Sequence, residues 1–273
     1  MIRTGNTTTV FEAMKTGGKD RIALKVLHGQ FKNDRGKLEE LRHEAAVGKE
    51  LKHPYVISIF DFTADYDLPL ISMQLFNARN LKQELRERKE LLQANLEEIT
   101  RKCAEGLGHL HSKGWVHCDV KPDNFLVDGH SNVKLIDFSI ARKAKKGFAA
   151  LLNRPKRLQG TRSYMAPEQI RRRSVTPATD IYGFGCVLFE MLAGKPPFTG
   201  TTPDEVLNRH LKAAAPSLQA SNNAVSDQFA ALITRMLSKD PEKRPKTINE
   251  FLKCYEDLNN RIFRAGRRPK LPT

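Results

Sequence analysis

The sequence lacks paired cysteines and any apolar run long enough to cross a membrane. Its four cysteines, Cys103, Cys118, Cys186 and Cys254, are far apart and form no C-x-x-C motif. A chain of 273 residues does not need disulfides for stability, so we expect reduced thiols and a cytoplasmic location. The most apolar run, "DIYGFGCVLFEMLAG", contains Glu190 and is shorter than the ~20 residues that span a bilayer. It therefore predicts a buried helix.

The N-terminal segment also lacks a charged start followed by an apolar run, which argues against a signal peptide. Acidic residues are scarce relative to basic ones, with 31 Asp and Glu against 46 Lys and Arg and a net charge of +15. This balance favours anionic partners, but composition does not choose among nucleotides, nucleic acid, acidic proteins and membrane surfaces. Hydrophobic residues make up 40% of the chain, which is enough for a globular core.

The hydrophobic patterns divide the chain into a strand-rich first part and a helical second part. Residues 7–14 and 21–27 read as strands around a Gly-Gly turn, and 34–54 read as a helix that ends before Pro54. Strand-like runs follow at 53–62 and 68–76. Amphipathic or buried helices are expected at 96–114, 178–198, 226–245 and 247–263, and a β-hairpin at 125–138.

The ends of that hairpin carry the residues that point to chemistry. Asn124 precedes its first strand and Asp137 follows its second, so an antiparallel return brings the two side chains together. Their oxygen atoms suit a hard cation such as Mg²⁺. Asp119 and Lys121 lie in the loop that leads into the hairpin. Two carboxylates, an amide and an ammonium group in one place suit phosphoryl transfer.

In this order, the segments "IALK", "RHEAAVGKELKHP", "HCDVKPDN", "DFS" and "APE" resemble the motifs of eukaryotic-type serine/threonine protein kinases, including bacterial ones. The resemblance covers nearly the whole chain and implies an α+β, two-lobed fold. A small β-rich N-lobe would occupy 1–76, a larger α-helical C-lobe 77–263 and a basic tail 264–273. The implied activity is transfer of the γ-phosphate of ATP to Ser or Thr hydroxyls of proteins, with Mg²⁺ or, alternatively, Mn²⁺.

The resemblance also assigns a role to each matching residue. Asp119 would be the catalytic base and Lys121 would steady the transferred phosphate, while Asn124 and Asp137 would bind the metal. The ATP-binding residues would be Gly5, Val10, Ala23, Lys25, Glu44, Gln74, Phe76 and Leu126. Supporting roles would fall to Asp180, which braces the catalytic loop, to the Glu168–Arg244 pair, and to His117, which packs under Phe138.

Three departures from the family pattern affect the nucleotide site. Only Gly5 of the three glycines in the phosphate loop is present, with Arg3 and Thr8 at the other positions and a short first strand. Ser139 replaces a glycine, which is tolerated only if the backbone there does not need positive φ. Gly48 replaces a large apolar residue that would contact Phe138. We therefore expect a mobile Glu44 helix and a partner or dimer that stabilises it.

Cys118 takes the place of the arginine that binds an activating phosphate in many relatives. Residues 140–159 contain no Ser, Thr or Tyr, and they hold seven basic residues: Arg142, Lys143, Lys145, Lys146, Arg154, Lys156 and Arg157. The two absences together predict activity without phosphorylation of this segment. Its basic charge has two open interpretations, a solvated loop or recruitment of acidic or phosphorylated protein substrates. The basic tail is either a solvated terminus or a linker in a longer, membrane-attached protein.

Two other functions remain as alternatives to an active kinase, for which no nucleic-acid partner is expected. A pseudokinase would bind nucleotide or partner proteins without turnover, and Gly48, Ser139 and the weak glycine loop motivate this alternative. A cysteine hydrolase would use Cys118 with His117. Adjacent residues on an extended loop point in opposite directions, which disfavours that pair.

Overall fold

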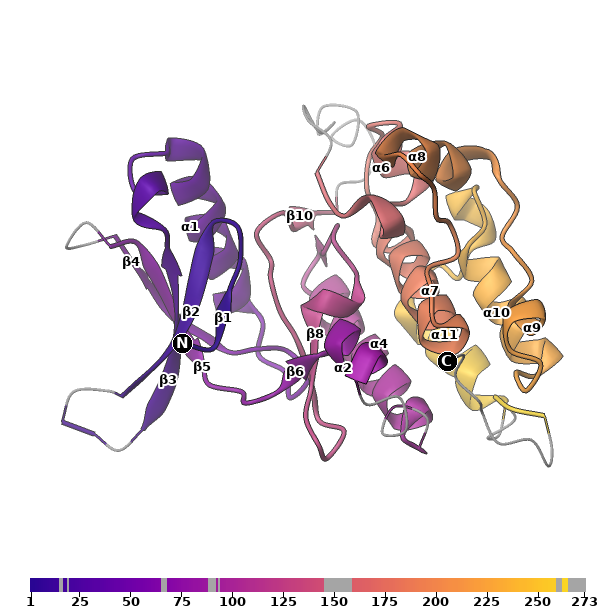
Figure 1. Cartoon of the computed structure of the whole chain (residues 1–273), viewed down its shortest axis with the longest axis horizontal. Helices are drawn as coiled ribbons and strands as arrows, with labels where there is room; N and C mark the ends of the chain where they lie inside the picture. Colours follow the sequence, from indigo (N-terminus) through magenta and orange to yellow (C-terminus); the bar gives the residue numbers. More distant parts are fainter. Residues whose placement is uncertain are drawn as a thin grey trace.

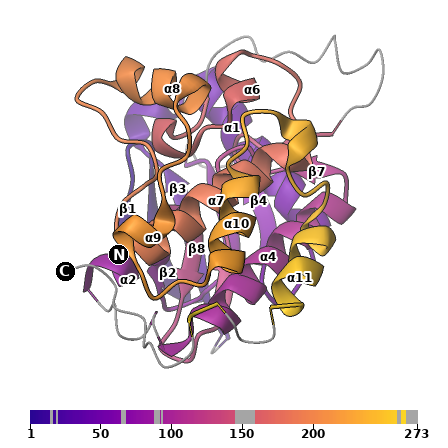
Figure 2. The same ribbon diagram turned by 90° about the vertical axis from the view of Figure 1, so that its right-hand side faces the viewer.

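The structure is a computed structural model that describes residues 1–14, 17–18, 20–64, 68–87, 92, 94–144, 159–258 and 262–264. Figure 1 shows two parts side by side, a sheet with helix α1 and a larger helical part. Seen from the helical end, the C-terminal helices α10 and α11 lie in front of the sheet (Figure 2). The expected two-lobed α+β architecture is confirmed. Most of the basic segment and of the tail, at 145–158 and 265–273, lies outside the described residues.

The N-terminal part is a five-stranded antiparallel sheet in the order β1-β2-β3-β5-β4. Its strands are β1 (Arg3–Thr4), β2 (Thr8–Met14), β3 (Arg21–Leu27), β4 (Ile59–Thr63) and β5 (Leu70–Gln74). The first strand has two residues, as the sequence predicts. Side chains alternate along β3, so Ala23, Lys25 and Leu27 face the same side. That side looks toward the helical part.

Helix α1 (Arg35–Glu50) packs against this sheet, mainly against β4. It begins at Asp34, whose carboxylate accepts the N–H groups of Gly36 and Lys37. Ile59 of β4 lies directly beside Gly48, because a Cβ atom at Gly48 would lie 2.3 Å from Ile59 Cδ1. A larger side chain at position 48 would therefore collide with Ile59. The missing contact of position 48 with Phe138 and the need for a stabilising partner stay predictions.

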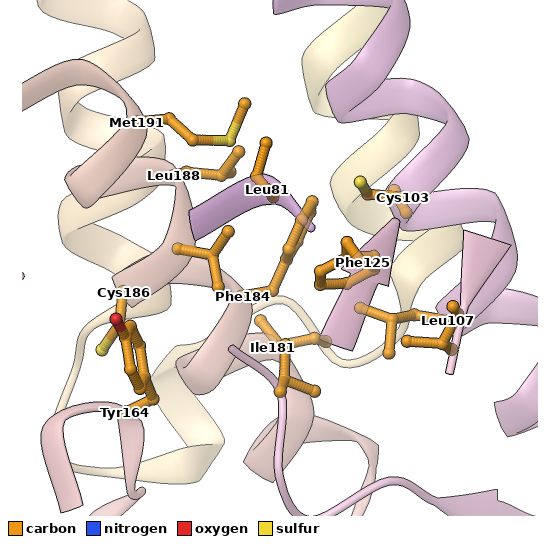
Figure 3. Packing of buried hydrophobic residues seen from close by; sticks show 14 of the residues in the cluster. Leu81, Cys103, Leu107, Phe125, Tyr164, Ile181, Phe184, Cys186, Leu188 and Met191 are labelled. Atoms are coloured by element: carbon orange, nitrogen blue, oxygen red, sulfur yellow. The ribbon is translucent and has the colours of Figure 1, made fainter. Parts of the chain in front are cut away.

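The C-terminal part is helical and is built around α7 (Pro177–Ala193), in which every residue from Ala178 to Ala193 is buried. The remaining helices are α2 (Leu81–Glu87), α4 (Leu96–Ser112), α6 (Pro167–Ile170), α8 (Pro203–Lys212), α9 (Leu218–Ser221), α10 (Asp227–Met236) and α11 (Ile248–Glu256). Short 3-10 turns are η1 (Gly29–Phe31), η3 (Pro122–Asn124), η4 (Arg162–Tyr164) and η5 (Pro241–Lys243). Phe184 of α7 meets Phe125 in the core between α2 and α4 (Figure 3), with ring centroids 6.2 Å apart.

Two expected helices are shorter than the sequence pattern predicts. The segment 226–245 is helical only to Met236, because Pro241 lacks an N–H and starts a separate 3-10 turn. The segment 247–263 is helical only to Glu256, and Phe263 instead forms a β-bridge with Val225. Within the described ranges, no helix is long and apolar enough to span a membrane.

Two small sheets join the helical part to the N-terminal sheet. The first contains β6 (Arg79–Asn80), β8 (Phe125–Val127) and β9 (Val133–Leu135), where β8 and β9 are the predicted hairpin. The second pairs β7 (Trp115–Val116) with β10 (Arg142–Lys143). These pairings bring the loop that contains Asp119 next to the residues that follow Asp137.

Candidate active site

A cavity of about 600 Å³ lies between the sheet and the helical part. All eight residues predicted to bind ATP line it: Gly5, Val10, Ala23, Lys25, Glu44, Gln74, Phe76 and Leu126. Lys121, Asn124 and Asp137 line the same space from the helical side, whereas Asp119 lies just outside it. The structure therefore brings together residues that are more than 130 positions apart in the sequence.

Lys25 and Glu44 form an ion pair inside this cavity. Lys25 Nζ donates to the two carboxylate oxygens of Glu44 at 2.7 and 2.6 Å, and Asp137 Oδ1 lies 3.8 Å from the same nitrogen. Burial disfavours a charged carboxylate and raises the pKa of Glu44 to about 7. Burial also opposes the charge on Lys25, but Glu44 and Asp137 outweigh it and raise the pKa of Lys25. The ammonium group therefore stays charged beside the cavity.

Asp119 is held by three donors, which lie on the loop between β7 and η3, on η3 itself and on the segment before η4. Its Oδ2 accepts from Lys121 Nζ at 2.6 Å, and its Oδ1 accepts the N–H of Thr161 at 2.8 Å. Asn124 Nδ2 donates to the Asp119 carbonyl at 2.8 Å. Lys121 Nζ also donates to Thr161 Oγ1 at 2.8 Å. The carboxylate is thus oriented, with a cation beside it, at the edge of the cavity.

Thr161 is a site residue that the sequence reasoning missed. It lies in the segment "GTRSYMAPE", of which only the final "APE" is among the kinase-like motifs named above. Gly160 allows the close approach, since it has φ +112 and a Cβ there would lie 3.2 Å from the Cys118 carbonyl. A short polar residue after a glycine, just before "APE", was the available signal.

Asp180 fixes the backbone of the loop that carries Asp119. From the buried helix α7, its carboxylate accepts the N–H of His117 at 2.7 Å and that of Cys118 at 2.9 Å. It also contacts His111 Nε2 at 2.8 Å. Cys118 has φ 68, a conformation that costs energy for a residue with a side chain and needs such support. The predicted contact of Asp180 with the loop is present.

Asp137 and Asn124 form a donor set that fits a hard cation. Burial disfavours charge on Asp137, but Lys25 and the Ser139 hydroxyl outweigh it and hold the pKa of Asp137 below its ordinary value. Asn124 uses its N–H₂ on Asp119, which leaves its oxygen free for a metal. The described residues contain no cluster of three or more His, Cys, Asp or Glu that could hold a metal. One carboxylate and one amide suit Mg²⁺ that keeps phosphate and water oxygens as further ligands.

The backbone conformation at position 139 is one that a residue with a side chain adopts without strain. Among the described residues with a side chain, positive φ occurs at Cys118, Ser131, Asp137 and Arg172, so Ser139 is not strained. Its hydroxyl donates to Asp137 Oδ1 at 2.8 Å. The backbone strain falls on Asp137 itself, at φ 67.

The phosphate-loop region differs from a three-glycine loop. The N–H of Gly5 donates to the Thr8 carbonyl at 2.8 Å, which closes a tight turn between β1 and β2. Thr8 already belongs to β2 and pairs with Leu27. Arg3 lines the cavity and lowers the pKa of Lys25 slightly against the larger effects named above. A cationic side chain therefore lies where a glycine would leave only backbone N–H groups.

Cys118 does not have the properties of a nucleophile. It is 7% exposed and packs with Val116 and Val175. Burial, followed by the nearby Asp180 carboxylate, raises the pKa of the thiol well above its ordinary value. His117 turns away, as expected for adjacent residues: its Nε2 donates to the Ile136 carbonyl at 3.1 Å, and its ring packs edge-on against Phe138 at 5.8 Å. These contacts argue against the cysteine hydrolase.

The comparisons with known proteins agree with this geometry. The sequence of PknA from Corynebacterium glutamicum, a serine/threonine-protein kinase, is 32% identical over 274 residues, covering 98% of this chain and 56% of PknA. PknB from Mycobacterium tuberculosis is 31% identical over 256 residues, covering 92% of this chain and 40% of PknB. PrkC from Bacillus subtilis is 31% identical over 229 residues, covering 84% and 35%. The chain thus spans about a third to just over half of the length of these relatives. The family description "Protein kinase domain" matches residues 1–255, and the chain therefore belongs to the serine/threonine protein kinase family.

Proposed function

We propose that the chain is an active kinase that transfers the γ-phosphate of ATP to Ser or Thr hydroxyls of proteins. The observation that carries the proposal is the oriented Asp119 carboxylate beside a cavity in which Lys25 and Glu44 are already paired. A kinase needs both features at once, because its catalysis depends on positioning and charge neutralisation. The family relationship implies ATP and a divalent metal in general terms.

In this proposal each residue has a role set by its contacts. When bound, ATP supplies the phosphoryl group and Mg²⁺, or Mn²⁺ in its place, neutralises its charge. Asp119 accepts the proton of the substrate hydroxyl, since its carboxylate faces the cavity edge and is held by Thr161. Lys121 lies 2.6 Å from that carboxylate and places a positive charge beside the reacting oxygen. Asn124 and Asp137 would hold the metal, and Lys25 would bind the phosphates.

The adenine end of the cavity is formed by the remaining predicted residues. Ala23 of β3 and Leu126 of β8 line the cavity from the two parts of the chain and would sandwich the base. Gln74, the last residue of β5, and Phe76, just after it, line the cavity, and their backbone groups would hold the ring edge. Val10 of β2 pairs with Lys25 across the sheet, which places it over the same space.

The test is transfer of labelled γ-phosphate to a protein or to the chain itself. Asp119→Ala should lower the rate by about 10²–10⁴-fold, the usual contribution of a general base. Asp204→Ala, on the exposed start of α8, is the matched control and should keep the wild-type rate. Equal rates for wild type and Asp119→Ala would overturn the assignment. Mass spectrometry of the product would identify the phosphorylated residue type.

We further propose that activity does not require phosphorylation of the activation segment, whose residues 140–159 contain no Ser, Thr or Tyr. Cys118 lies in an apolar cluster with Val116 and Val175 and offers no cation to a phosphate. Residues 140–144 and Gln159 carry no hydroxyl, and residues 145–158 lie outside the described residues. Phosphatase treatment should leave the rate unchanged, and Cys118→Arg should not create a phosphorylation-dependent gain. A large gain in that variant would contradict this proposal.

Acidic protein substrates are the finer proposal for the substrate class. Arg162 follows Thr161 directly and is exposed, so it lies one residue from a contact of the Asp119 carboxylate. Arg171, Arg172 and Arg173 are exposed on the same segment after α6. Arg162→Glu should reduce the rate on acidic peptides more than on basic peptides, with exposed Arg21→Glu in the sheet as control. Equal loss on both peptides would reject the preference.

A pseudokinase is the second candidate, and the Arg3 side chain in the cavity is the observation that favours it. Binding of Mg-ATP without transfer would support this function. It ranks second because Lys25, Glu44, Asp119, Asn124 and Asp137 are all in place. A cytoplasmic location is also a proposal, supported by four cysteines that are all free, three of them buried.

A further inference from the structure

The end of helix α1 makes a cluster of contacts that none of the proposed catalytic roles uses. Glu50 is the last residue of α1, and its Oε2 accepts the indole N–H of Trp115 at 2.8 Å. The same oxygen accepts from Lys143 Nζ at 3.1 Å. Lys143 also lies 4.1 Å from the centroid of the Trp115 ring, in a cation–π contact. One carboxylate, one indole and one ammonium group therefore contact each other pairwise.

The three residues come from three segments whose relative positions matter for the site. Glu50 belongs to the helix that carries Glu44, Trp115 to the strand that leads into the Asp119 loop, and Lys143 to the strand after Asp137. Trp115 and Lys143 are also paired in register between β7 and β10. The cluster thus ties α1 to both sides of the catalytic loop.

A second contact, two turns earlier on α1, also connects this helix to the segment after Asp137. His43 Nε2 donates to the Ala141 carbonyl at 2.7 Å, and the His43 ring packs edge-on against Trp115 at 5.6 Å. His43 directly precedes Glu44 in the chain, so this bond acts next to the ion pair with Lys25. Trp115 is 8% exposed and lies between the two ties.

We propose that Glu50, Trp115 and Lys143 form a latch that holds α1 and the segment after Asp137 in the arrangement in which Glu44 meets Lys25. They are positioning residues, and the inference rests on the proposed kinase function. An arginine–phosphate pair would connect the Asp119 loop with the segment after Asp137. The latch instead connects α1 with the strands that flank these two elements, while Cys118 is buried among apolar side chains. It would make the arrangement a property of the unmodified chain.

The physical balance of the latch is consistent with this role. Glu50 and Lys143 are each about half exposed, with side-chain exposures of 47% and 46%, so their ion pair alone is weak. The buried indole adds a directed N–H donor, and together with Lys143 it lowers the pKa of Glu50. Glu50 therefore stays ionised, and the network is stronger than the surface pair.

Three variants test the latch, each with a limited change. Glu50→Gln removes the charge, Lys143→Met removes the ammonium group, and Trp115→Phe keeps a ring under Lys143 without the N–H donor. Each should lower kcat by roughly 3- to 10-fold, the range typical of positioning effects transmitted through a packed element. The controls are Glu242→Gln and Lys246→Met, which break an exposed ion pair in the C-terminal part and should leave kcat unchanged.

Two readouts separate positioning from a general loss of stability. Trp115 is the only tryptophan, so acrylamide quenching of its fluorescence reports on the latch directly. Quenching should increase in Glu50→Gln and Lys143→Met but not in the controls. In a Glu44→Gln background, Glu50→Gln should cause no further loss of kcat, since the latch acts through Glu44. A full additive loss there, or kcat and quenching equal to the controls, would overturn the latch.

Failure of the latch is distinguishable from failure of the proposed function. If wild type transfers phosphate and Glu50→Gln matches Glu242→Gln, the latch is wrong and the kinase function stands. If wild type transfers no phosphate, the kinase function is wrong, and the latch is judged by quenching and by the Kd for Mg-ATP. A Kd that is equal in Glu50→Gln and Glu242→Gln, with equal quenching, would then reject it.

Discussion

Two buried ion pairs, one in each part of the molecule, have opposite surroundings. Glu168 and Arg244 meet in the helical part through two parallel bonds of 2.8 and 2.9 Å, and the Arg244 side chain is 0% exposed. The remaining Arg244 donors go to backbone carbonyls, and Thr179 Oγ1 donates to Glu168. Lys25 and Glu44 meet beside an open cavity, with Asp137 close by, and no carbonyl of the described residues bonds to Lys25 Nζ.

The difference in surroundings distinguishes an ion pair that stabilises the fold from one that can also bind a ligand. In the Glu168–Arg244 pair, called the closed pair here, both charges are satisfied by fixed protein groups, so no donor is left for a ligand. In the Lys25–Glu44 pair, called the open pair here, burial raises the pKa of Glu44 to about 7. The cavity beside the Lys25 ammonium group still has room for a phosphate oxygen. An incompletely satisfied buried charge beside a cavity indicates a functional site.

The largest effect should come from breaking the closed pair. Arg244→Met leaves the Glu168 carboxylate buried without a counter-charge, and we expect a loss of about 3–5 kcal/mol in the free energy of unfolding. Urea denaturation measures it. The double variant Arg244→Met with Glu168→Gln should recover part of the loss, and no recovery would contradict this explanation.

Breaking the open pair should affect catalysis instead. Lys25→Met should lower kcat/KM for ATP by roughly 10²–10³-fold, the cost of losing one charged donor to the reacting group. The stability loss should be smaller than for Arg244→Met, because Glu44 takes up a proton near neutral pH and faces the cavity. Phosphotransfer rates and urea denaturation on the same sample compare the two. Equal losses in the free energy of unfolding for Lys25→Met and Arg244→Met would contradict the distinction between the two pairs.

The Lys25–Glu44 pair should also make the activity depend on pH. Glu44 gains a proton as the pH falls through about 7, so kcat/KM should be about tenfold lower at pH 6 than on the alkaline plateau. The free energy of unfolding should change with pH in the opposite direction to kcat/KM. The folded state binds this proton more tightly than the unfolded chain, so the contribution of Glu44 is full below about pH 4.5 and declines up to pH 7. Glu44→Gln should remove the slope in kcat/KM, and a persisting slope would assign it to another group.

The smallest effect compares two hydroxyl groups, one beside Lys121 at the candidate site and one beside the Glu168–Arg244 pair. Thr161→Val removes an acceptor for Lys121, and Thr179→Val removes a donor to Glu168. Each bond should be worth about 0.5–1.5 kcal/mol. We expect Thr161→Val to lower kcat several-fold with little change in Tm, and Thr179→Val to lower Tm with little change in kcat. A loss of Tm in Thr161→Val together with a loss of kcat in Thr179→Val would contradict this expectation.

Much of the site follows from local sequence. The hairpin at 125–138 brings Asn124 and Asp137 together because antiparallel strands return the chain, and β8 and β9 pair as expected. Alternation along β3 places Lys25 and Ala23 on the cavity side. Periodicity alone also predicts α7 as a buried helix. These features depend on neighbours in sequence, which pattern reasoning can use.

Other features depend on contacts between distant segments, which no local pattern contains. Ile59 fills the space beside Gly48, although a glycine alone suggests a gap. Thr161 reaches Asp119 from 42 positions away. Trp115 and Lys143 meet Glu50 across 65 and 93 positions, and each reads locally as an ordinary strand or surface residue. The resemblance to kinases supplied the roles of residues, but not these supports.

The carboxylate of Asp180 has a consequence for the order in which the protein is made. It holds the His117 and Cys118 N–H groups, yet it lies 61 positions (180 − 119) after Asp119 in the chain. During synthesis the N-terminal part emerges first and can fold first. The loop with Asp119 cannot take its final shape until the ribosome has released α7. A nascent chain can therefore complete the sheet that lines one side of the cavity before Asp180 is available to hold the loop with Asp119.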